Sequence, residues 1–105
     1  MRLKRTRIFD EWLGKLKDFH AVNRIGARIA RLEEGNPGDC KKLPGGDVTE
    51  MRIDYGGGYR VYYTRQGSGI ILLLIGGDKK TQRKDIQTAL EMSENLREGK
   101  DDDRY

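Results

Sequence analysis

Two adjacent lysines, Lys79 and Lys80, stand between an apolar segment, residues 70–75, and a predicted helix that starts after Thr81. The N–H groups that open a helix are free and carry partial positive charge, so cations beside them are disfavoured unless an anion joins them. This arrangement indicates phosphate as a ligand. Exposed lysine pairs are also common in turns and the dipole penalty is small, so an ordinary turn is an equal alternative.

Two arginines, Arg52 and Arg60, fall on predicted neighbouring strands. Residues 48–55 and 59–66 alternate with a period of two and flank three glycines, a pattern typical of a β-hairpin. A three-residue loop would place Tyr55 opposite Tyr59, and a two-residue turn at Gly67-Ser68 would place Ile75 opposite Arg60. The alternation then assigns one polar face, interpreted as the working surface: Glu50, Arg52, Asp54, Arg60, Tyr62 and Thr64. Cross-strand ion pairs on a solvated face are the alternative.

The elements that must position these residues indicate an α+β fold. Residues 1–8 suggest a weak edge strand, Phe9 to Lys17 a first helix, and Asp18 the cap of a second helix that ends before residues 35–38. The two helices form a helical hairpin, predicted to cover the apolar face of a small antiparallel sheet: Met51, Ile53, Tyr55, Tyr59, Val61 and Tyr63. The order is strand, two helices, three strands and a last helix with Ile86, Ala89 and Leu90 as its apolar side.

Length and composition favour one domain. The chain has 105 residues, 36% of them charged, and a net charge of +4, which permits nucleic-acid binding without requiring it. Residues 1–98 are expected to form the domain and residues 99–105 an acidic, disordered tail. A single cysteine and the absence of a secretory or membrane-spanning segment predict a cytoplasmic protein. The single histidine, His20, argues against zinc sites and Ser-His-Asp catalysis, so neither metal nor cofactor is expected.

Four segments, FDEWLGKLKD, AVNRIGARIARLEEGNPGD, EMRIDYGGGYRVYY and LLLIGGDKKTQRKDIQTA, carry a family resemblance. Together they resemble the RelE/ParE superfamily toxins, in particular the HigB-like group known as addiction module killer proteins. The resemblance implies a RelE-like fold and the role of toxin in a type II toxin-antitoxin system. It also implies mRNA cleavage on the ribosome and a cognate antitoxin, commonly a helix-turn-helix protein, in a complex that could be a heterotetramer.

The resemblance also implies roles for individual residues. Arg52 and Arg60 resemble basic residues that grip the scissile phosphate, and Lys79 and Lys80 resemble a basic pair after the last central strand. Cleavage without a metal needs a proton acceptor for the ribose 2′-OH, a proton donor and cations over the phosphoryl oxygens. Glu50 is the candidate base, and Tyr62 could stack on a nucleobase or donate a proton.

Several alternatives remain open. Arg24, Arg28 and Arg31 are candidates for RNA binding, although a solvated helix face is the more ordinary explanation. Some ribonuclease members of the family use a histidine or tyrosine close to the C-terminus, whereas here the only aromatic residue near the C-terminus is Tyr105, beyond the acidic tail. A ParE-like gyrase inhibitor and a non-toxic RelE-fold interaction protein are therefore alternatives to the endoribonuclease. The antitoxin is expected to cover the basic sheet face or to displace the last helix.

Overall fold

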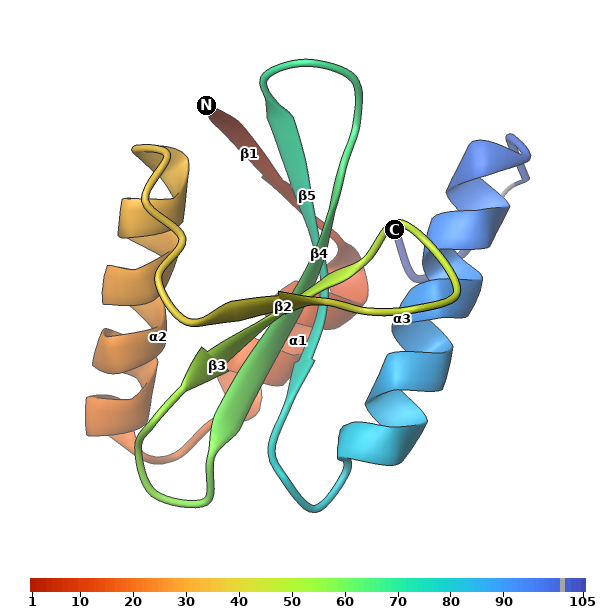
Figure 1. Ribbon diagram of the computed structural model, residues 1–105. Helices are drawn as coiled ribbons and strands as arrows, with labels where there is room; N and C mark the ends of the chain where they lie inside the picture. Colours follow the sequence, from red (N-terminus) through yellow and green to blue (C-terminus); the bar gives the residue numbers. More distant parts are fainter. Residues whose placement is uncertain (101) are drawn as a thin grey trace.

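The computed structural model describes residues 1–100 and 102–105 and has an α+β architecture (Figure 1). Its elements are β1 (Arg2–Arg5), α1 (Arg7–Lys15), α2 (Phe19–Glu33), β2 (Cys40–Lys42), β3 (Thr49–Ile53), β4 (Tyr59–Arg65), β5 (Ile70–Gly77) and α3 (Gln82–Arg97). The sheet is mixed, with the strand order β1-β5-β4-β3-β2. None of the helices in this part of the chain is both long and apolar enough to span a membrane.

The sheet is covered on both faces. On one face α1 and α2 bury Phe9, Ile25 and Leu32 against alternate strand residues, and these strand residues include the predicted apolar set. On the other face α3 buries Ala89 and Met92 against Tyr62, Leu72 and Leu74. Figure 1 shows α2 and α3 on opposite sides of the sheet. The face interpreted as a working surface is therefore a second core over much of its area, and only its Arg52–Arg60 end stays open.

The β3–β4 hairpin has a longer loop than predicted. Arg52 pairs with Arg60 and Glu50 with Tyr62, so the loop comprises residues 54–58 and the predicted pairing of Tyr55 with Tyr59 is wrong. Tyr55 N–H donates to Ile53 O and Gly58 N–H donates to Tyr55 O, with positive φ at Gly56 and Gly58. The register differs from the predicted one by two residues, which is a whole period, so each side chain keeps its predicted face.

The β4–β5 register also differs from the prediction. Arg60 pairs with Gly77 rather than Ile75, a difference of two residues. One comes from the turn, since Arg65 pairs with Ile71 rather than Ile70, and the other from a bulge that leaves Leu74 as an extra residue between the partners of Tyr62 and Tyr63. β1 forms the edge strand that the sequence suggested, but it pairs in parallel with β5, so the sheet is mixed and the prediction of an antiparallel sheet is wrong in this respect. β2 was missed; it contains three residues, which are too few to show a period.

The tail contacts the domain. Ile8 N–H donates to Arg104 O at 3.0 Å, and the Arg104 guanidinium bonds Glu91 at 2.9 Å. The Tyr105 hydroxyl donates to Met92 O on α3. Residues 102–105 thus differ from the expected disorder, and Asp101 lies outside the described residues. Tyr105 packs against the core under α3 and is not part of the Arg52–Arg60 end of the sheet.

Thr6 joins three elements through one hydroxyl group. Its Oγ1 accepts the Phe9 N–H at 3.0 Å, which caps α1, and donates to the carbonyl of the bulge residue Leu74 at 2.6 Å. Thr6 is 1% exposed, so water cannot replace either bond. The residue that caps α1 therefore also binds the carbonyl group of the bulge residue in β5.

A Thr6→Val variant is expected to be less stable by about 1–3 kcal/mol, since it keeps the shape of the side chain and removes both hydrogen bonds. Thermal unfolding followed by circular dichroism should show a melting temperature lower by roughly 4–8 °C for each kcal/mol. Thr6→Ser keeps the hydroxyl group and serves as the control. Equal melting temperatures for Thr6→Val and the wild type would contradict this role.

Candidate functional site

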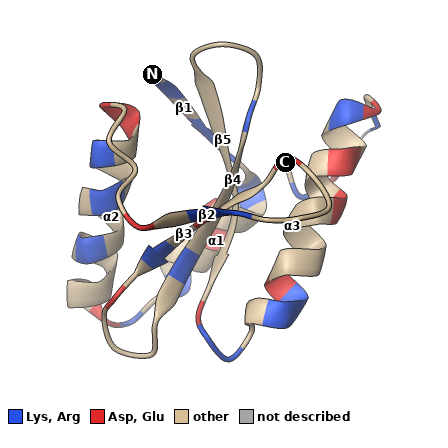
Figure 2. Cartoon of the chain, in the orientation of Figure 1, with Lys and Arg blue, Asp and Glu red and all other residues tan. Residues whose placement is uncertain are grey.

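The arginines of β3 and β4 meet at the open end of the sheet. Arg52 and Arg60 are direct cross-strand partners on one face, and with Asp39, Asp54, Gly58 and Tyr59 they line a groove of ≈ 310 Å³. That volume lies at the low end of the range for small-molecule sites. Figure 2 shows Lys and Arg on β3, on β4 and on the turn between β5 and α3 at this same end. The predicted grouping of these cations is therefore confirmed in its main part.

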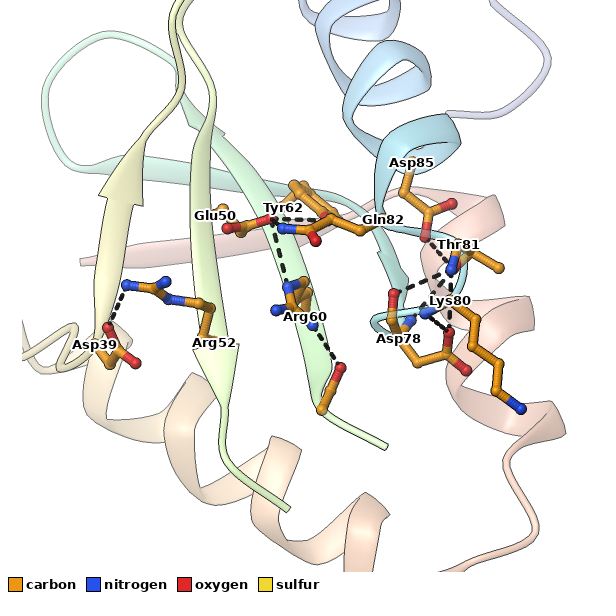
Figure 3. A network of polar contacts seen from close by, with 11 residues as sticks. Asp39, Glu50, Arg52, Arg60, Tyr62, Asp78, Lys80, Thr81, Gln82 and Asp85 are labelled. Carbon is orange, nitrogen blue, oxygen red and sulfur yellow. Dashed lines mark hydrogen bonds and ion pairs between the residues drawn. The ribbon is translucent and has the colours of Figure 1, made fainter. Parts of the chain in front are cut away.

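The β5–α3 turn reaches the groove through the glycine loop. Lys79 N–H donates to Gly57 O at 3.4 Å. A Cβ atom added to Gly58 would lie 3.7 Å from Lys79 Cβ and 3.3 Å from Arg60 Nη1, so Lys79 and Arg60 flank this glycine. Figure 3 shows the Lys80 side chain extending away from Arg60. Lys79 thus lies beside the groove at Gly58, whereas the Lys80 side chain extends away from it.

A carboxylate already lies in the turn before α3. Asp78 Oδ1 accepts the backbone N–H groups of Lys80 at 2.9 Å and Thr81 at 3.2 Å. The carboxylate of Asp78 therefore supplies negative charge beside the lysines, where the sequence argument expected a phosphate, while the side chain of the N-cap residue Thr81 makes no capping hydrogen bond to the backbone of α3.

Arg60 is held more firmly than Arg52. The Arg60 side chain is 12% exposed and donates from Nη1 to Gly58 O at 2.8 Å, while its Nε lies 3.6 Å from Glu50 Oε2. The Arg52 side chain is 43% exposed and pairs with Asp39 at 3.0 Å. An exposed ion pair contributes about 0–1 kcal/mol, so a phosphate can compete with Asp39 for Arg52. Arg60 is already oriented before any ligand arrives.

Glu50 and Tyr62 are buried, which corrects their predicted roles. Glu50 is 2% exposed and Tyr62 is 0% exposed, because α3 covers this part of the sheet. The Tyr62 hydroxyl donates to Glu50 Oε2 at 3.0 Å. Burial, and then the neighbouring Glu50 charge, raise the pKa of Tyr62, so its phenol stays protonated at physiological pH. Tyr62 cannot stack on a nucleobase here, and Glu50 cannot reach a ribose hydroxyl group.

The arginines of α2 lie beside the groove. Arg24, Arg28 and Arg31 line a second depression, which shares Ile53 and Asp54 with the first. Arg24 lies over the Tyr55 ring, 4.9 Å from its centroid. Arg28 donates to the carbonyl groups of Arg52, Pro37 and Asp39, so it fastens α2 to the edge of β3. The three predicted candidates for RNA binding are thus adjacent to the groove, although Arg28 is engaged in structural contacts.

Comparison with known proteins places this arrangement in a family. The family model "Phage derived protein Gp49-like (DUF891)" matches residues 11–94. The chain belongs to the Gp49-like family. A protein of Haemophilus influenzae described as uncharacterized is 48% identical over 96 residues, which covers 91% of this chain and 96% of that protein. The region matched by the family model contains Arg52, Arg60, Lys79 and most of α3.

Two residues of this Gp49-like protein escaped the sequence argument. Gln82, the first residue of α3, donates from Nε2 to Glu50 Oε2 at 2.9 Å, and Asp39 pairs with Arg52 (Figure 3). Gln82 belongs to the GGDKKTQ segment, where only the lysines were assigned a role. Asp39 precedes β2, a strand that the sequence did not reveal. Within residues 1–100 and 102–105, no group of three or more His, Cys, Asp or Glu side chains is placed to hold a metal ion.

Gly77 determines how closely α3 approaches the groove. A Cβ atom at this position would overlap the Asp85 carboxylate and lie 2.8 Å from Thr81 Oγ1. The Thr81 hydroxyl donates to Asp85 Oδ2 at 2.5 Å. Burial raises the pKa of Asp85, and the Thr81 bond opposes that rise. The first turn of α3 is therefore packed directly on the β5 backbone, which brings Gln82 within reach of Glu50.

Proposed function

We propose that this Gp49-like protein is the toxin of a type II toxin-antitoxin system and that it cleaves mRNA on the ribosome without a metal ion. Support comes from the resemblance to the HigB-like toxins, which extends over the region matched by the family model. The observation that carries the proposal is the groove lined by Arg52 and Arg60, with Lys79 beside it at Gly58. A helix-turn-helix antitoxin that covers this groove is the proposed partner.

In this proposal the groove acts on the phosphate of the scissile bond. The ribose 2′-OH attacks the adjacent phosphorus, and negative charge builds up on the phosphoryl oxygens. Arg60 is suited to stabilise this charge because its planar guanidinium matches the geometry of a phosphate and its bond to Gly58 O fixes it in advance. Arg52 exchanges Asp39 for a phosphate oxygen, and Lys79 adds a third positive charge.

A second candidate is an inhibitor that binds its target without hydrolysis, as a ParE-like gyrase inhibitor does. The burial of Glu50 and Tyr62 favours it, because it removes both predicted proton-transfer groups from the groove. The carboxylate and phenol side chains that line the groove are Asp39, Asp54 and Tyr59, and Asp39 is paired with Arg52. Inhibition by binding alone requires no proton transfer from any of them.

Induced expression in a bacterium, followed by primer extension on abundant transcripts, separates these functions. The endoribonuclease is expected to arrest growth and produce new 5′ ends in translated mRNA, and Arg60→Ala should abolish both effects. Growth arrest with a DNA-damage response and intact transcripts would instead select the gyrase inhibitor. Normal growth with soluble, folded protein would contradict both and select a non-toxic interaction protein.

A further inference from the structure

One carboxylate oxygen, Glu50 Oε2, lies next to three potential donors. The Tyr62 hydroxyl donates to it at 3.0 Å and Gln82 Nε2 at 2.9 Å, while Arg60 Nε stays at 3.6 Å. The Glu50 side chain is 3% exposed, so these three donors compete for its oxygen atom away from water. Gln82 is the only one of the three donors that comes from α3; the other two are on β4.

The distances show which donor is excluded. A carboxylate oxygen has about two lone-pair sites, and here Tyr62 and Gln82 occupy those of Oε2. A separation of 3.6 Å is too long for a hydrogen bond, and among the described residues Arg60 Nε is a buried polar atom without a hydrogen-bond partner. Arg60 is thus attracted to Glu50 by charge but is not hydrogen-bonded to it.

The remaining guanidinium donors of Arg60 are available to a ligand. Nη1 makes one bond, to Gly58 O, and Nε is the only buried Arg60 nitrogen without a partner among the described residues. Nη2 therefore faces accessible space at the groove. A full hydrogen bond between Nε and Glu50 would need a movement of about 0.8 Å, since charge-assisted bonds are typically 2.7–2.9 Å long. That movement would draw the guanidinium away from the groove.

We propose that Gln82 is a positioning residue: by occupying Glu50 Oε2, it keeps Arg60 from closing onto Glu50 and leaves the guanidinium free for an RNA phosphate. The seating of α3 on the sheet then sets how strongly the groove holds its ligand. This inference rests on the proposed function for the identity of the ligand. The competition among the three donors itself does not depend on that function.

Gln82→Met tests the positioning role because it keeps the length of the side chain and removes its donor. We expect it to lower affinity for single-stranded RNA about tenfold and to reduce the salt dependence of binding by about one phosphate contact. Gln87→Met, at an exposed position of the same helix, is the matched control and should bind as the wild type does. Adding Glu50→Gln to Gln82→Met should restore most of the affinity, since a neutral amide still accepts from Tyr62 but does not capture Arg60.

The probe is a fully 2′-O-methylated RNA oligonucleotide, which cannot be cleaved, with binding followed by fluorescence anisotropy at several salt concentrations. NMR of the arginine Nε–H groups supplies a readout independent of RNA, and thermal melting confirms that each variant is folded. In Gln82→Met the Arg60 Nε–H signal should move downfield and exchange more slowly. An unchanged signal, or a folded double variant that binds as weakly as Gln82→Met, would overturn the positioning role.

The two readouts separate this inference from the proposed function. If the wild type fails to bind the RNA while the Arg60 Nε–H signal still shifts in Gln82→Met, the donor competition is supported and RNA is the wrong ligand. If the wild type binds RNA and Gln82→Met binds equally well with an unshifted signal, the ligand is right and the positioning role is wrong.

Discussion

Arg60→Ala is expected to reduce RNA cleavage at least about 100-fold and to abolish growth arrest, because it removes a fixed cation from the reacting phosphate. Arg60 is the groove cation with the most restricted side chain, so its orientation costs little when the transition state forms. The measurement is cleavage of a defined mRNA on purified ribosomes, together with growth after induction. The cleavage activity of Arg60→Lys should lie between those of the wild type and Arg60→Ala, since lysine keeps the charge and loses the planar fork of donors.

Arg60→Ala also leaves Glu50 buried with one fewer cation beside it, and breaking a buried pair typically costs about 3–5 kcal/mol. The variant Arg60→Ala/Glu50→Gln removes both charges and should regain stability without regaining activity. Arg83→Ala, on the exposed side of α3, controls for the loss of one positive charge. A folded Arg60→Ala protein that is still fully toxic would refute the proposed role of the groove.

Gly76→Ala is expected to destabilise the fold markedly. A Cβ atom at Gly76 would overlap the six-membered ring of Trp12, which packs from α1 against the β5 backbone. Overpacking typically costs about 1–3 kcal/mol, so the melting temperature should fall by roughly 4–8 °C for each kcal/mol. Thermal unfolding followed by circular dichroism measures the effect.

The clash at Gly76 can be tested by a compensating change. Trp12→Leu removes the ring atoms that would meet the new methyl group, so the double variant should be less destabilised than the sum of the two single variants. Gly14→Ala is the control: no atom lies within 4 Å of its added Cβ, and alanine favours the helix. Strict additivity of Gly76→Ala and Trp12→Leu would show that the two residues are not in contact.

Local signals in the sequence predicted much of the fold. Asp18 accepts the N–H groups of His20 and Ala21, so the predicted cap of α2 is confirmed, and this interaction spans only three residues. The face of each hairpin residue was also predicted correctly, although the loop length was wrong. The reason lies outside the hairpin: Tyr55 leaves the strand and bonds Asp18, which is 37 residues away in sequence.

The site was predicted less completely than the fold, because the position of α3 is a tertiary property. Its apolar residues predicted a buried side without indicating which face of the sheet it covers. The run IILLLI in β5 held the missing signal, since it is apolar at both alternate positions and so requires cover on both faces. That cover removes Glu50 and Tyr62 from solvent and brings in Gln82, which has no distinguishing sequence pattern.

The parallel pairing of β1 with β5 affects the order in which the molecule can be assembled. The chain is synthesised from its N-terminus, so the Thr6 hydroxyl cannot bond the Leu74 carbonyl until 68 more residues have been added. Likewise, Glu50 cannot accept its hydrogen bond from Gln82 until Gln82 has been added. Contacts between residues so far apart in the sequence form late in folding. A nascent chain therefore cannot complete this sheet, or form the contact between Gln82 and Glu50, until β5 and the start of α3 have been translated.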